Sequence, residues 1–177
     1  MKELHLSENP IQDAGLEALA RQYDAICTVS RLYLRNCQIR DPTPLFTSSA
    51  QYNPALRLLD LSENFLDCPE FGSITTFLHR QKFIEQLIFQ KCQLKKRALK
   101  AIGEGLLRNT TLRSLQLQDN EFPHDSHTFE LGRGCATVRS LSLEGNLMLH
   151  DQAVISLVQG LQSANEISLQ TLDLRSL

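Results

Sequence analysis

The chain has 177 residues, of which 42% are apolar, and a formal net charge of -2 at pH 7. This length suits one domain. The nearly balanced charge argues against a nucleic-acid binder or an electrostatic membrane anchor. No stretch approaches the roughly 18 apolar residues of a membrane span, and the first residues read as part of a repeat rather than a signal sequence. We therefore expect a single soluble domain over residues 1–177.

A motif of the form Leu-x-Leu-x-x-(Asn/Cys)-x-Leu recurs along the whole chain. Its first leucines lie 26 to 31 residues apart, a period long enough for one strand and one helix. The strands are predicted at Leu4–Leu6, Leu32–Leu34, Leu59–Leu61, Leu87–Phe89, Leu115–Leu117, Leu141–Leu143 and Leu172–Leu174. The corresponding repeats cover about 1–28, 29–55, 56–83, 84–111, 112–137 and 138–168, with a partial repeat at 169–177.

Two apolar columns accompany the strands. The two leucines of each strand are two residues apart, so both point into the core while the residues between them face outward. The column three residues before the first leucine is Met1, Val29, Leu56, Ile84, Leu112, Val138 and Leu169. The column after the turn is Ile11, Ile39, Leu66, Leu94, Phe122 and Met148. The first of these columns is predicted to close each repeat against the next.

Helical spacing follows the turns. The second repeat contains Asp41-Pro42-Thr43-Pro44, which should delay its helix to about Leu45, because a residue before proline avoids the helical region. The fifth repeat holds Pro123, Gly132 and Gly134, which predict a short or irregular helix. Helix faces in the other repeats are Leu16, Leu19 and Tyr23; Phe71, Ile74 and Leu78; Leu99, Ile102 and Leu106; and Val154, Leu157 and Leu161.

One slot of the motif is predicted to be polar yet buried. It lies five residues after the first strand leucine and points inward at the turn. A buried amide is costly unless hydrogen-bonded, so we expect the asparagines there to bond the loop backbone of adjacent repeats. The slot is filled by Asn9, Cys37, Asn64, Cys92, Asn120 and Asn146.

The five cysteines indicate a reducing environment. No CxxC pair suggests zinc or redox chemistry. Cys37 and Cys92 occupy core slots, whereas Cys27, Cys68 and Cys135 fall near helix ends. We expect all five to be reduced thiols in an intracellular protein, cytoplasmic or nuclear.

Repeats of about 28 residues with an alternating Asn and Cys slot resemble the ribonuclease-inhibitor-like class of leucine-rich repeats. The first repeat carries the Asp13-Ala14-Gly15 signature that opens the helix in that class. The resemblance covers the whole chain and departs at Asn146, which breaks the alternation, and at Leu177, which fills the last slot. It implies an α/β fold, a right-handed solenoid bent into a horseshoe arc, with parallel strands on the concave face and helices on the convex face. It also implies protein binding, without specifying the partner.

A candidate binding site lies on the outward face of repeats two to four. Tyr33, Leu58 and Ile88 should lie on adjacent strands about 4.8 Å apart. Aromatic and arginine anchors inside a mixed-charge rim are typical of an interface hot spot. The alternative is that single exposed apolar residues are ordinary on a sheet. The flanking residues of the candidate site are Arg31, Arg35, Asp60, Glu63 and Lys91.

Other chemistry is only weakly indicated. The segment His124-Asp125-Ser126-His127, with Asp119 nearby, offers metal ligands but matches no zinc spacing. No Gly-x-Ser-x-Gly elbow and no phosphate-binding glycine loop occur. We expect no catalytic residue, no metal and no cofactor.

The sequence therefore predicts a non-catalytic protein-interaction module, a scaffold or sensor segment of a larger protein or complex. The alternative is a regulator of an enzyme, a GTPase activator or an inhibitor, that acts by docking on its target. Neither end carries the polar cap of a terminal repeat. We therefore expect a larger chain or assembly to cover both ends, with protein partners and neither nucleic acid nor membrane.

Overall fold

Strands and helices alternate along the chain in the computed structural model, which describes residues 2–22, 28–47, 54–66, 71–120, 122–123 and 127–177. Some residues named in the sequence predictions lie outside this description, namely Met1, Tyr23, Cys27, Cys68 and 124–126. The strands are β1 (Glu3–His5), β2 (Arg31–Tyr33), β3 (Leu58–Asp60), β4 (Gln86–Ile88), β5 (Ser114–Gln116), β6 (Ser140–Ser142) and β7 (Thr171–Asp173). The helices are α1 (Gln12–Arg21), α2 (Thr43–Thr47), α3 (Gly72–Arg80), α4 (Lys96–Leu106), α5 (Thr128–Gly134) and α6 (Asp151–Gln162), with a 3-10 turn at Cys135–Thr137.

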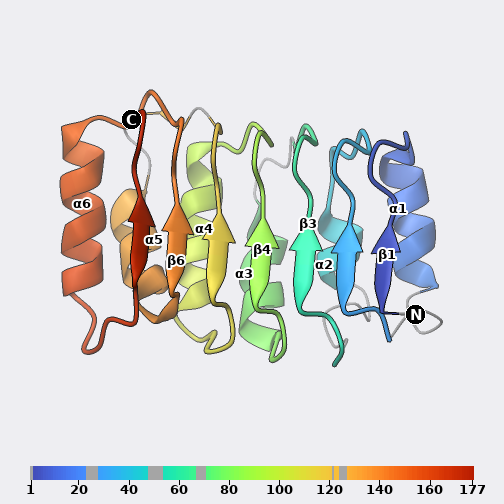
Figure 1. Cartoon of the computed structure of the whole chain (residues 1–177), viewed down its shortest axis with the longest axis horizontal. Helices are drawn as coiled ribbons and strands as arrows, with labels where there is room; N and C mark the ends of the chain where they lie inside the picture. Colours follow the sequence, from blue (N-terminus) through green and yellow to red (C-terminus); the bar gives the residue numbers. More distant parts are fainter. Residues whose placement is uncertain (1, 23–27, 48–53, 67–70, 121, 124–126) are drawn as a thin grey trace.

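All strands of the described chain form one parallel sheet in sequence order, β1 to β7. The register pairs equivalent positions of successive repeats, so that Leu32 lies beside Leu59 and Leu59 beside Leu87. Figure 1 shows the strand arrows running in one direction with the helices behind them. The predicted α/β leucine-rich repeat solenoid is confirmed.

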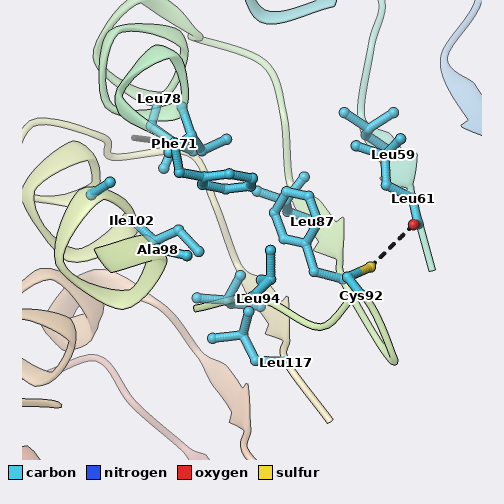
Figure 2. Close-up of a cluster of buried hydrophobic side chains, with 14 of the residues drawn as sticks. Leu59, Leu61, Phe71, Leu78, Leu87, Cys92, Leu94, Ala98, Ile102 and Leu117 are labelled. Atoms are coloured by element: carbon cyan, nitrogen blue, oxygen red, sulfur yellow. Dashed lines mark hydrogen bonds between the residues drawn. The ribbon is translucent and has the colours of Figure 1, made fainter. Parts of the chain in front are cut away.

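The core lies between the sheet and the helices. The first strand leucines of β2 to β6 are fully buried, including Leu59 and Leu87. Phe71 joins neighbouring repeats, with ring centroids 6.1 Å from Phe46 and 5.7 Å from Phe89. Figure 2 shows this cluster filled by leucines of the strands and side chains of the helices. Each fully buried leucine or phenylalanine stabilises the fold by about 2 kcal/mol, so the repeated column dominates the packing energy.

The asparagine slot links consecutive repeats through the loop backbone. Asn64 Oδ1 accepts the N–H groups of Cys37 at 2.9 Å and Ile39 at 3.0 Å. Its Nδ2 donates to the carbonyls of Leu34 at 2.7 Å and Leu61 at 2.8 Å. Asn120 and Asn146 make the same kind of contact two and three repeats further on. These amides have the predicted structural role.

Asn9 differs from this prediction. Its side chain is exposed and donates only within its own repeat, to the carbonyls of Leu6 and Ser7 at 3.0 Å each. The cause is position: β1 is the edge of the described sheet, so no preceding loop lies beside it.

Three cysteines are described, and all three are buried and free. The thiols of Cys37 and Cys92 each donate to a carbonyl of the preceding repeat, Leu6 and Leu61 respectively, at 3.2 Å. The second contact is the dashed line in Figure 2. Burial raises the pKa of the Cys92 and Cys135 thiols far above the usual range, so both are neutral near pH 7.

Two helical predictions have different outcomes. Helix α2 begins at Thr43 rather than near Leu45. Pro44 then falls in the first turn, where its missing N–H has no intrahelical partner to lose, and Asp41 Oδ1 accepts the Thr43 N–H at 2.9 Å. The short fifth helix is confirmed, because α5 has seven residues and ends in the 3-10 turn.

The predicted core role of Met148 is wrong. Met148 is 48% exposed, whereas the next residue, Leu149, is 2% exposed. The turn after β6 is one residue longer than the motif, and the Leu149 N–H bonds the Asn146 carbonyl at 2.9 Å. Leu149 therefore fills the inward position.

Candidate protein interface on the open sheet face

The face of the sheet that the helices leave uncovered is here called the open face (Figure 1). Five of the eight residues of the candidate site lie on strands of this sheet. The five strand residues come from β2, β3 and β4, and their register places Arg31 beside Leu58 and Tyr33 beside Asp60. Ile88 lies on the other side of Asp60. The remaining three residues, Arg35, Glu63 and Lys91, stand in the turns that leave these strands.

The apolar part of the site is interrupted by a carboxylate. Tyr33, Leu58 and Ile88 are each partly buried and lie on successive strands. Across the sheet, however, Asp60 of β3 lies between Tyr33 of β2 and Ile88 of β4, and its Oδ1 accepts the Ser62 N–H at 2.9 Å. A partner that covers this surface has to place apolar groups on either side of a negative charge.

The arginines of the site are already paired with acids. Arg31 donates to Glu3 at 2.5 Å, and Arg35 donates to Glu63 at 2.7 Å. The Arg31 guanidinium beside Glu3 lowers the pKa of that carboxyl, with a smaller contribution from His5. Exposed pairs of this kind contribute little to stability. They are therefore available to exchange their partner for one on another protein.

The turn residues Glu63 and Lys91 share an unusual backbone. Their φ angles are 56° and 53°, in the left-handed region that L residues rarely adopt. The same position has positive φ in neighbouring repeats, as at Glu8 and Asn36. This turn orients the side chains away from the buried slot that follows, which explains why charged residues are accepted there.

Two features near the site escaped the sequence interpretation. The His5 ring stacks on Tyr33 with centroids 4.4 Å apart and an interplanar angle of 10°, which extends the aromatic surface onto β1. The register places His5 and Tyr33 side by side on β1 and β2. Phe65, 45% exposed, lines a hollow of about 600 Å3 with Asn36 and Glu63 at the end of the sheet where strands lead into helices. The sequence feature that could have revealed Phe65 is a large apolar residue at the variable motif position between Asn64 and Leu66.

Among the described residues, no group of three or more His, Cys, Asp or Glu side chains is arranged to hold a metal ion. The candidate segment around His124 and Asp125 lies outside those residues. In the described part of the chain, the helices are too short or too polar to cross a bilayer.

Comparisons with known proteins give a repeat family, a relative in sequence and a solved structure. The leucine-rich repeat family matches residues 1–20 and 108–122. The human NACHT, LRR and PYD domains-containing protein 14 is 27% identical over 128 residues, which is 71% of this chain and 12% of that protein. The chain thus spans about an eighth of the length of this curated relative. Internalin C2 from Listeria monocytogenes aligns over 97% of this chain and 77% of its own, with 16% identity and a TM-score of 0.34. With its parallel sheet and repeated motif, the chain is a leucine-rich repeat protein.

Proposed function

We propose that this chain is a non-catalytic protein-interaction module, a scaffold or sensor segment of a larger intracellular protein, and that its open face binds a protein partner. The observation that carries the proposal is the juxtaposition of Tyr33, Leu58 and Ile88 on β2 to β4, bordered by Arg31 and Arg35. Large side chains and arginines of this kind supply most of the binding energy in protein interfaces. The small share of its relative that the chain covers supports a role within a larger protein.

Affinity capture from a reducing cell extract tests the proposal. We expect the double variant Tyr33→Ala, Ile88→Ala to lose a partner that the wild-type protein retains, with affinity reduced at least about tenfold, because each truncated anchor costs about 1–2 kcal/mol. Quantitative mass spectrometry of both eluates identifies the partner. Titration with the purified partner then gives the two dissociation constants.

The control truncates two exposed apolar residues on the helical side of the molecule, Leu107 just after α4 and Ile155 in α6. Leu107→Ala, Ile155→Ala removes two side chains that are each 48% exposed. This control should retain the partner, and thermal unfolding should show that both double variants are folded. Equal recovery by the wild-type protein and the sheet variant would refute the assignment to the open face. If the captured partner is an enzyme, a change in its turnover on addition of this chain would favour the regulator alternative over a scaffold.

A further inference from the structure

The edge of the sheet where strands begin carries a basic column distinct from the open face. Arg57, Glu85, Arg113 and Arg139 each directly precede one of the strands β3 to β6. Their backbones are hydrogen-bonded in series: the Glu85 N–H to the Arg57 carbonyl at 2.8 Å, Arg113 to Glu85 at 2.7 Å, and Arg139 to Arg113 at 2.9 Å. Neighbouring positions are therefore about 4.8 Å apart. The strand arrows in Figure 1 start along this edge.

This edge is hollowed and positively charged. The four residues line a depression of about 350 Å3 together with Lys82, Phe83 and Thr111. Its lining thus holds four cations and one carboxylate, on a chain whose net charge is -2. Glu85 lies 3.6 Å from the Arg57 guanidinium. Among the described residues, Lys82, Arg113 and Arg139 have no acidic partner.

An aromatic ring completes the depression. Phe83 is 39% exposed, and the Arg57 guanidinium lies over its ring at 5.1 Å from the centroid. This contact fixes the orientation of Arg57. The adjacent Arg113 and Arg139 repel each other, and a bound anion would relieve that repulsion. The lining therefore combines guanidinium groups, which bind carboxylates in a bidentate manner, with one apolar surface.

We propose that this basic edge, defined by Arg57, Lys82, Phe83, Arg113 and Arg139, binds an acidic protein segment that runs across the strand entries. An extended peptide with several carboxylates and an apolar residue matches both the cations and the ring. A nucleic-acid strand fits less well, because stacking platforms need successive aromatic rings and this lining has one. The edge is separate from Tyr33 and Ile88, so the two surfaces can be tested independently.

Fluorescence anisotropy with a synthetic probe tests this proposal. The probe is a labelled peptide of Glu, Asp and Leu about ten residues long, which is ample to cross the column. A peptide with Gln and Asn in place of the acids is the neutral control. We expect the acidic peptide to bind more tightly, with an affinity that falls as ionic strength rises. The variant Arg113→Gln, Arg139→Gln should weaken binding at least about tenfold, because each charged hydrogen bond contributes appreciably.

Matched variants separate the site from general charge effects. Arg97→Gln, Arg133→Gln changes the net charge equally on the exposed side of α4 and α5 and should leave affinity unchanged. Glu85→Gln removes the one carboxylate of the lining and should tighten binding several-fold, a gain that misfolding cannot produce. Equal losses in the two arginine pairs, or no response to Glu85→Gln, would overturn the proposal. If a single-stranded oligonucleotide of the same charge binds more tightly than the acidic peptide, the ligand of this edge is a nucleic acid and the proposal is overturned.

Discussion

The Asn and Cys residues of the buried slot satisfy the loop backbone in complementary ways. An asparagine oxygen accepts two N–H groups of the preceding repeat, as Asn120 does for Cys92 at 3.0 Å and Leu94 at 3.2 Å. A cysteine sulfur instead donates to a carbonyl of the preceding repeat, as Cys92 does to Leu61 at 3.2 Å. Each of these repeats therefore completes the hydrogen bonding of the repeat before it.

Replacing Asn64 with Ala should destabilise the protein by about 3 kcal/mol or more. The N–H groups of Cys37 and Ile39 and the carbonyl of Leu34 would remain buried without a partner, and each unsatisfied group costs about 1–3 kcal/mol. The matched control is Asn9→Ala in the exposed slot of β1, expected to cost less than about 1 kcal/mol. Urea denaturation measures both. Equal costs would contradict the role of the inter-repeat bonds.

The buried thiols should resist alkylation in the folded protein. The thiolate is the reactive form, and burial raises the pKa of Cys92 and Cys135, so this form is scarce at neutral pH. Iodoacetamide treatment followed by peptide mass spectrometry should find both unmodified in native buffer and modified in urea. Fast modification of Cys92 under native conditions would show that its repeat opens readily.

At the scale of elements, strands were far more predictable than helix starts. The strand leucines recur with a fixed spacing, so their position and register follow from one motif, as Leu59 and Leu87 illustrate. The length of the turn and the start of the helix vary between repeats. Local proline chemistry shifted the start of α2 to Thr43, and one extra turn residue exchanged Met148 for Leu149 in the core. The outward-facing strand positions of the candidate site could be predicted from the motif. The stacking of the His5 ring on Tyr33 could not, because it depends on side-chain rotamers that no motif specifies.

Glycines set the distance between the last two helices, which gives a prediction at this scale. A methyl group at Gly160 would collide with the Phe129 carbonyl, and one at Gly132 with the Leu157 carbonyl. The backbones of α5 and α6 are therefore in close contact. Gly160→Ala should destabilise the fold by about 1–3 kcal/mol through overpacking.

The control for this prediction is Gly72→Ala at the start of α3, where an added methyl group has no neighbour within 4 Å. It should be neutral or slightly stabilising, because alanine favours the helix and restricts the unfolded chain. Thermal unfolding of both variants decides the matter. A similar loss at Gly72 and Gly160 would mean that glycine flexibility, rather than helix contact, is required.

At the scale of the whole molecule, the repeats form a one-dimensional array in which each contacts its neighbours. The interior strands have partners on both sides, and their leucines Leu59, Leu87 and Leu115 are fully buried. The end strands β1 and β7 have one partner each, and Leu4 and Leu172 are only partly buried. The stabilisation from buried apolar side chains is therefore smallest at the two ends of the described sheet.

Native-state hydrogen exchange should reveal this gradient. We expect amides of β3 to β5 to exchange more slowly than those of β1 and β7, because end repeats open without disrupting the interior. The ion pairs that join the end strands to their neighbours, Arg31 with Glu3 and Arg175 with Glu144, are exposed and contribute little to stability. Raising the salt concentration should therefore leave the gradient intact. Uniform protection across the sheet would show instead that all repeats open together. The inter-repeat asparagine bonds would then have to couple the end strands to the interior more strongly than the burial of those strands indicates.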